Sequence, residues 1–253
     1  MLMAQRLTKI AAVLMAIALP GISSAFTIYD EFGSFEDATW GGSGIPNDAV
    51  AASMQIVNGD DLLRVAMSAT ERYSNPAVGD NGEAIYSAEI GSNCGVDTDP
   101  VGCPSANQGA LWNWNYFVDV TGGGVLGDYQ IDIWYDLEAG AQRAFGDLSG
   151  LGRIDITASL YAQGLENLTM IEGSENNLFA WLGTDQLPFV DAPDTVFDPN
   201  AVGNYQYAIT VTRTGFPVDT VAMEVNTVPV PASIWLLGSA IGLLGWIRRR
   251  MAR

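Results

Sequence analysis

Apolar and polar residues alternate along much of the chain between positions 26 and 227, a pattern typical of half-buried β-strands. The segment Tyr129–Leu137 is a clear example, with apolar residues at its odd positions and mostly polar residues between them. Gly, Asn, Asp and Pro interrupt the alternation as turns do. The strong predicted strands are residues 63–69, 112–120, 129–137, 154–160, 205–211 and 221–225. The weaker ones are residues 26–29, 53–57, 84–90 and 178–182.

About ten strands in some 200 residues, without a convincing helical period, predict an all-β fold. We expect one antiparallel β-sandwich, jelly-roll-like, over residues 26–227. The Gly-rich segments Trp40–Gly44 and Thr121–Val125 are predicted loops, and the second separates two strong strands. Asn226 and Thr227 are predicted to be a short spacer between this ectodomain and the tail that follows.

Residues 1–25 have the three parts of a secretory signal peptide. Arg6 and Lys9 precede the apolar stretch Ile10–Leu19, and small residues follow it. We expect a signal peptidase to cleave between Ala25 and Phe26, so that the export machinery carries the chain across the inner membrane. The alternative, an uncleaved anchor, is disfavoured because a membrane-spanning helix needs about 20 apolar residues.

Residues 228–253 contain three motifs in order. A Pro-x-Pro turn comes first, then the uncharged apolar run Ile234–Ile247, then a cluster of arginines. The run is 14 residues long, whereas a stable span needs about 20, so we expect a short transmembrane helix that serves as a temporary anchor. The basic cluster marks its cytoplasmic side. A buried core helix is the alternative. The residues of the proposed signal are Pro229, Val230, Pro231, Ala232, Arg248, Arg249 and Arg250.

This arrangement resembles the PEP-CTERM sorting signal of Gram-negative bacteria, in its Val-Pro-x-Pro-Ala variant. The resemblance implies processing by an exosortase, an integral-membrane enzyme that cleaves near the prolines and passes the protein outward. It implies a transient inner-membrane anchor, then the cell surface or extracellular matrix, and by association a biofilm and exopolysaccharide context. Val230 stands where the family name has a glutamate. The resemblance covers about a tenth of the chain and implies no activity.

Charge is distributed unevenly. All 29 acidic residues lie between Asp30 and Glu224 against five arginines, a net charge of about −24 for the ectodomain. Such a surface repels nucleic acid, so we expect no nucleic-acid partner. Solubility in a salty medium explains the acidity, and calcium binding is the alternative. The candidate calcium ligands, Asp60 with Asp61 and Asp97 with Asp99, lack the glycine and distal glutamate of an EF-hand, and we predict no metal site.

Cys94 and Cys103 are the two cysteines, and an even count in an exported chain predicts one disulfide rather than two reactive thiols. Histidine is absent, which excludes Ser-His-Asp and Cys-His catalysis and removes the commonest zinc ligand. We therefore predict no catalytic residues and no enzyme activity. A glycoside hydrolase, which needs two carboxylates alone, is an alternative.

Two aromatic residues, Phe117 and Trp134, lie on the polar sides of their predicted strands. On an exposed face they would stack on sugar rings, as in a carbohydrate-binding module, whereas in a covered strand they would be core. The leading hypothesis is a non-enzymatic surface or matrix protein. A glycan-binding module and a carboxylate glycosidase are the two alternatives.

Overall fold

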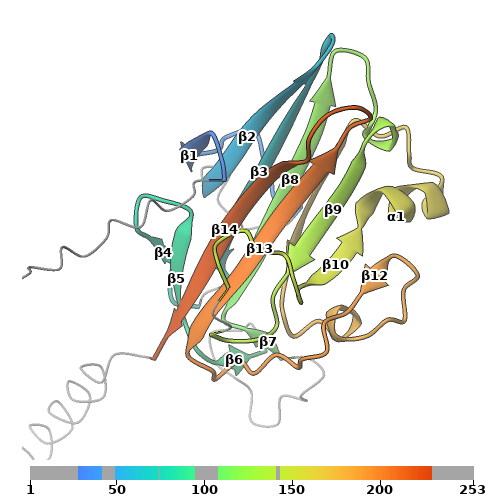
Figure 1. Cartoon of the computed structure of the whole chain (residues 1–253). Coiled ribbons are helices and arrows are strands. Elements are labelled where there is room, and N and C mark those ends of the chain that lie inside the picture. Colours follow the sequence, from blue (N-terminus) through green and yellow to red (C-terminus); the bar gives the residue numbers. More distant parts are fainter. Residues whose placement is uncertain (1–27, 42–48, 74, 95–107, 141–142, 230–253) are drawn as a thin grey trace, which may run out of the picture.

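The computed structural model describes residues 28–41, 49–73, 75–94, 108–140 and 143–229, which form two β-sheets packed face to face (Figure 1). The predicted β-rich, sandwich-like fold is confirmed. The predicted signal peptide and residues 230–253, with the apolar run and the arginines, lie outside the described residues. In the part that is described, no helix has the length and apolar character needed to cross a bilayer.

The first sheet has five antiparallel strands, and its longest pairing joins the two strands at its centre, β3 and β8. Its edge strands, β1 and β11, are short. In spatial order the strands are β1 (Glu31–Ser34), β2 (Val50–Asn58), β3 (Asp61–Glu71), β8 (Trp112–Thr121) and β11 (Met170–Glu175).

The second sheet has seven strands, with β13 and β14 near its centre. Its order is β12 (Val190–Asp191), β10 (Gly152–Asp155), β9 (Gln130–Tyr135), β13 (Gly203–Thr212), β14 (Asp219–Val228), β5 (Ile85–Glu89) and β4 (Gly79–Asp80). A small ladder joins β6 (Ser92–Asn93) to β7 (Gly109–Ala110). The purely antiparallel, jelly-roll-like prediction is wrong at one pair, because β14 and β5 run parallel, with Val225 opposite Tyr86.

The core lies between the sheets and is rich in aromatic rings. Trp114 of β8 stacks on Tyr207 of β13, with ring centroids 5.3 Å apart, and on Tyr135 of β9 at 6.2 Å. All three side chains are fully buried. Burial of one large apolar side chain stabilises a fold by about 1.5–3 kcal/mol, so this contact between sheets is a major part of the packing.

A second, smaller core lies on the outer face of the five-stranded sheet. There the segment 35–41 folds back over the sheet, and Trp40 and Phe35 pack with Phe117. The Glu172 carboxylate of β11 holds this segment by accepting hydrogen bonds from the backbone N–H groups of Thr39 and Trp40, both at 2.8 Å. Phe117 is consequently buried on a face that alternation alone assigns to solvent.

The predicted strand over residues 154–160 is wrong after its first two residues. Strand β10 ends at Asp155, whose carboxylate accepts a hydrogen bond from Ala158 N at 2.7 Å and caps helix α1 (Ile156–Gln163). Gly164, at φ 69°, ends the helix in the left-handed conformation that glycine favours. Alternation over Ile156–Leu160 is compatible with both periods, and the cap decides between them.

Three further predictions are wrong. Residues 178–182 contribute to a 3-10 turn, Ala180–Gly183, rather than a strand. Of the predicted strand 26–29, residues 28 and 29 are described, and they lie before β1, which starts at Glu31. Asn226 and Thr227 are not a spacer, because β14 continues through them to Val228, which lies opposite Glu89 of β5.

Candidate functional site

The outer face of the seven-stranded sheet carries a half-buried tryptophan between polar neighbours. Trp134 of β9 lies opposite Arg153 of β10, and Arg153 lies opposite Asp191 of β12, so the three residues form one row across three strands. The Trp134 indole Nε1 donates a hydrogen bond to Thr210 Oγ1 of β13 at 2.9 Å. This bond fixes the ring on the sheet.

Two aspartates beside this row are tied to one arginine. Arg153 donates from Nε to Asp132 at 2.8 Å and from Nη2 to Asp155 at 2.7 Å. The Gln130 side-chain amide donates to the same two carboxylates, each at 3.0 Å. The network therefore offers a rigid array of charged and polar groups beside an aromatic ring, and its arginine offsets part of the negative charge.

A cavity of about 390 Å³ opens beside the row, where β10 and β12 meet the loop that precedes β12. Asp185 in that loop is held in place by Ala192 N, which donates to its carboxylate at 2.7 Å. The cavity thus combines apolar wall groups with carboxylates that can accept hydrogen bonds from hydroxyl groups. It is lined by Arg153, Asp155, Asp185, Leu187, Pro188, Phe189, Val190 and Asp191.

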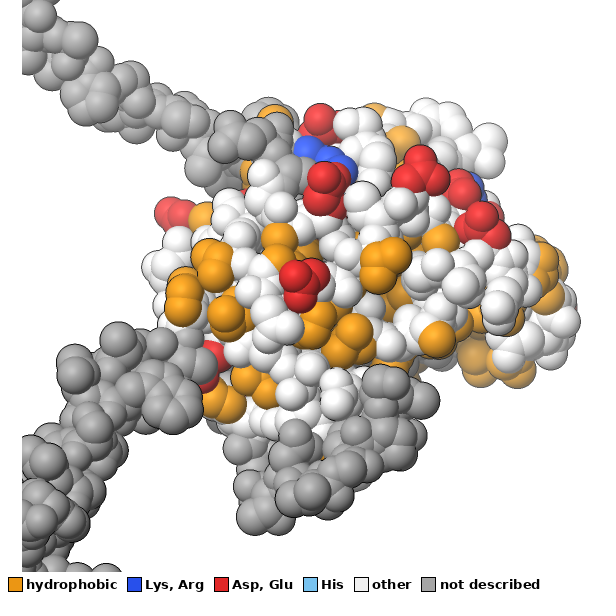
Figure 2. All heavy atoms as spheres, turned by 90° about the horizontal axis from the view of Figure 1, so that it is seen from below, with side chains coloured by type: hydrophobic (Ala, Val, Ile, Leu, Met, Phe, Trp, Pro, Cys, Tyr) orange, Lys and Arg blue, Asp and Glu red, His pale blue; other side chains and the backbone are white. Residues whose placement is uncertain are grey.

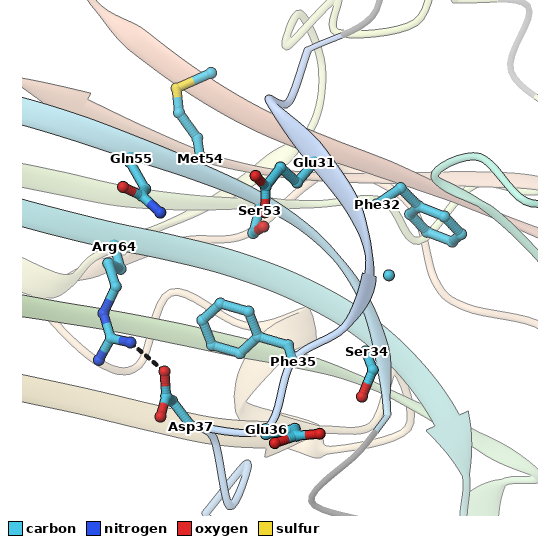
Figure 3. Close-up of a pocket in the computed structure, with 11 residues that line it drawn as sticks. Glu31, Phe32, Ser34, Phe35, Glu36, Asp37, Ser53, Met54, Gln55 and Arg64 are labelled. Atoms are coloured by element: carbon cyan, nitrogen blue, oxygen red, sulfur yellow. Dashed lines mark hydrogen bonds and ion pairs between the residues drawn. The ribbon is translucent and has the colours of Figure 1, made fainter.

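A second cavity, of about 360 Å³, lies along β1 and β2 (Figure 3). Arg64 and Asp37 point toward one another at its edge and form an ion pair, and Phe35 lies beside them. Arg64 also donates to Asp119 at 2.9 and 2.6 Å, and these bonds raise the pKa of its guanidinium further. Because its arginine is occupied by two aspartates and Phe35 belongs to the smaller core, we interpret this region as the clasp that holds segment 35–41.

Burial raises the pKa of three acids among the described residues, Glu175, Asp136 and Glu224 of β14. Burial raises the pKa of Glu175 to about 7, because β11 places it opposite Trp114 and therefore on the core side of the sheet. Burial also raises the pKa of Asp136, although Arg143 lies 3.0 Å away and opposes the shift. Glu175 belongs to the five-stranded sheet and Asp136 follows β9 of the other. Glu175 and Asp136 therefore belong to separate sheets and are not a pair built on one strand ladder, and Asp136 is paired with Arg143 instead.

The structure separates the two aromatic candidates and one of the aspartate pairs. Of the two alternatives that the sequence left open, Phe117 takes the buried one and belongs to the core, whereas Trp134 is half-buried on the outer face. Asp60 is exposed, and Asp61 accepts hydrogen bonds from Gly124 N at 2.9 Å and from the Tyr129 hydroxyl at 3.1 Å. Across the described ranges no cluster of three or more Cys, Asp and Glu side chains is placed to hold a metal ion.

Other sequence-predicted residues lie outside the described residues. Among them are Asp97, Asp99 and Cys103, so the disulfide from Cys94, which directly follows β6, stays a prediction. The predicted cleavage position at Ala25 and Phe26 and the residues of the predicted sorting signal from Val230 onward also lie there. Pro229 is described, immediately after β14.

Sequence reasoning missed the pair Asn176 and Asn177, which are both buried. Asn176 accepts a hydrogen bond from Ala110 N at 2.9 Å and donates to Ala110 O at 3.1 Å and to Trp112 O at 2.9 Å, and so anchors β7 and the start of β8. No local pattern marks them, since Asn-Asn is ordinary in an exposed turn.

Comparison of the chain with protein-family models, with curated proteins and with solved structures finds no match.

Proposed function

We propose that this chain is an exported, non-enzymatic interaction protein of the cell surface or extracellular matrix. Residues 1–25 direct export, residues 228–253 act as a transient inner-membrane anchor and sorting signal, and the sandwich is the module delivered. The observation that carries the proposal is the continuity of β14 with the tail. The strand lies inside a sheet, hydrogen-bonded to β13 and β5, and Pro229 of the signal follows it directly.

This continuity suits a protein that is presented on a surface. A pull on the tail is transmitted to the pairs along β14 on both of its sides, rather than to an edge strand or a flexible linker. The acidic coat keeps such a module soluble and away from nucleic acid. An exosortase-type enzyme, a signal peptidase and the inner membrane are the partners this proposal requires, and exopolysaccharide is the matrix partner.

Fractionation of a bacterium that carries a matching exosortase tests the proposal. We expect the double variant Pro229→Ala/Pro231→Ala to remain in the inner-membrane fraction, whereas the natural chain reaches the surface or medium with a shortened C-terminus, as read by mass spectrometry. Pro199→Ala, in a loop of the sandwich, is the matched control and should be processed normally. Equal processing of all three chains would overturn the sorting role of residues 228–253.

The row containing Trp134 favours a second candidate function, binding of a glycan. Neighbouring strands lie about 4.8 Å apart, so the row from Trp134 through Arg153 to Asp191 spans about 10 Å. An aromatic ring that stacks on a sugar, with carboxylates and an arginine beside it for the hydroxyl groups, is the chemistry a short oligosaccharide requires. The adjoining cavity provides depth at one end of the row.

A glycan array followed by calorimetry tests this second candidate. Trp134→Ala should abolish binding, while Tyr73→Ala, which removes an exposed aromatic ring elsewhere, should leave it unchanged. If both variants still bind the glycan, the row is not the binding site. Turnover of a polysaccharide panel tests the third candidate, a carboxylate glycosidase. If the chain hydrolyses a polysaccharide and Asp132→Asn or Asp155→Asn abolishes that hydrolysis, the non-enzymatic proposal is wrong.

A further inference from the structure

One end of the sandwich presents exposed valines where the chain leaves β14. Val202 and Val228 flank the paired residues Gly203 and Thr227, which places them side by side at the ends of β13 and β14. They are 56% and 42% exposed, and Val196 in the preceding loop is 91% exposed. Figure 2 looks at this end of the molecule and shows apolar side chains gathered over it, with few acidic side chains between them.

The loop that carries Val196 is firmly seated. Phe197 is buried against Trp112 and Tyr205, with ring centroids 6.4 and 5.3 Å apart, and it anchors the loop from below. Pro199 O accepts a hydrogen bond from Gly91 N at 2.7 Å, which ties the same loop to the segment after β5. The exposure of Val196 is therefore the consequence of a fixed backbone that turns its neighbour inward.

The chain outside this end restricts what can cover it. Five residues, Pro229 to Ser233, separate Val228 from the apolar run Ile234–Ile247. Even fully extended, the six Cα-to-Cα steps from Val228 to Ile234 reach at most about 22 Å. While the run lies in a bilayer, the end of the sandwich at Val228 is consequently held within that distance of the membrane surface.

We propose that this end, defined by Val196, Val202 and Val228, is the membrane-facing surface of the anchored protein and rests on the lipid headgroups and upper acyl chains. The inference rests on the proposed function, because it needs the tail to be inserted. The exposed acids beside the valines, Asp194 and Asp198, favour zwitterionic over anionic lipid. The contact keeps the end at Val228 against the membrane and the other end of β14, which starts at Asp219, away from it.

The opposite end of the sandwich supplies matched controls. Val57 and Val218 are 67% and 55% exposed, similar to the valines of the membrane-facing surface. Val218 directly precedes β14, and the ten residues of this strand span about 30 Å. The two ends thus differ in distance from the tail rather than in the kind of side chain exposed.

Site-specific photo-crosslinking in phosphatidylcholine vesicles tests the inference with the full chain. A benzophenone amino acid replaces Val196, Val202, Val57 or Val218, one at a time, and lipid adducts are measured by mass spectrometry after vesicle flotation. We expect adducts from positions 196 and 202 and background levels from 57 and 218. Equal adducts at all four positions, or background at all four, overturn the membrane-facing surface.

Flotation separates this failure from failure of the proposed function. A chain that floats with the vesicles but gives no adducts at 196 and 202 is anchored, and the present inference alone is wrong. A chain that does not float lacks the anchor, which overturns both.

Discussion

The indole Nε1 of Trp114 donates a hydrogen bond to Oδ1 of Asn177, 2.9 Å away, inside the core between the two sheets. The amide of the same asparagine donates to the Tyr207 hydroxyl at 2.7 Å and to the Asp136 carbonyl at 3.0 Å. Trp114 belongs to β8 of one sheet and Tyr207 to β13 of the other, so Asn177 satisfies polar atoms of both sheets. An unpaired polar atom in a core is costly. Asn177 supplies hydrogen-bond partners to Trp114 and Tyr207 and thereby allows both side chains to be buried.

Replacing this asparagine should destabilise the whole sandwich. Asn177→Leu leaves Trp114 Nε1 and the Tyr207 hydroxyl without their partner, and each loss costs about 1–3 kcal/mol. We expect the free energy of unfolding, measured by denaturant titration, to fall by about 3 kcal/mol. Asn200→Leu, at an exposed loop position, is the control and should change it little. A Leu variant as stable as the natural chain would show that the hydrogen bonds contribute nothing net.

Stability should fall with rising pH because of Glu175. Its pKa is raised by burial to about 7 in the folded state, whereas an unfolded glutamate titrates near 4.5. The folded state therefore binds the proton more tightly, and the stabilisation is complete below pH 4.5 and is lost as the pH rises to 7. At one pKa unit per 1.36 kcal/mol, the loss is up to about 3 kcal/mol.

Glu175→Gln removes this titration. We expect the variant and the natural chain to unfold at similar temperatures at pH 4, and the variant to be the more stable at pH 8. Thermal melts followed by circular dichroism across this range measure the difference. Glu36→Gln, at an exposed position, should run parallel to the natural chain. A constant offset between Glu175→Gln and the natural chain at every pH would contradict a buried titrating carboxyl.

Truncations should locate the boundary between fold and tail at Pro229. A chain of residues 26–229 retains the whole of β14 and should fold into a soluble protein with a cooperative melt. A chain of residues 26–223 loses the five register pairs that join Glu224–Val228 to β5, together with Thr227, whose hydroxyl bonds to Gly203 and Ala201. We expect this shorter chain to melt far lower or to aggregate. If both truncations aggregate, residues beyond 229 belong to the core.

Alternation located most of the long strands because each has one face in the core, as in β13, where Tyr205 and Tyr207 point inward. It failed where a distant segment changes the environment. Phe117 is buried by residues 35–41, about 80 positions away, and no local pattern reveals such a cover. The parallel pair of β14 and β5 and the hydrogen bonds of Asn177 depend in the same way on contacts between segments far apart in the chain.

The candidate site was predictable in one residue. Trp134 breaks the polar side of β9 in the sequence, and it does lie on the outer face. Its surroundings were not predictable, since Arg153 and Asp191 reach it through the order β9-β10-β12, which the mistaken strand over 154–160 obscured. The helix cap at Asp155 depends on a single hydrogen bond to Ala158, which hydrophobic periodicity does not encode.

Asp61 would bind a cation in a calcium loop, whereas in a hydrogen-bonded turn its carboxylate accepts hydrogen bonds from the protein. Its two carboxylate oxygens accept hydrogen bonds from Gly124 N and the Tyr129 hydroxyl, and this joins the β2–β3 turn to the segment after β8. Asp61→Ala should therefore lower the free energy of unfolding by about 2 kcal/mol, equally in calcium and in EDTA. Asp60→Ala, which removes the exposed neighbour, should be nearly neutral.

Magnesium and calcium at equal ionic strength should shift the melting temperature of the natural chain alike, because screening depends on ionic strength. A bound calcium would instead stabilise saturably, by about 2.7 kcal/mol at a hundredfold excess over Kd, and the loss in Asp61→Ala would then grow with calcium.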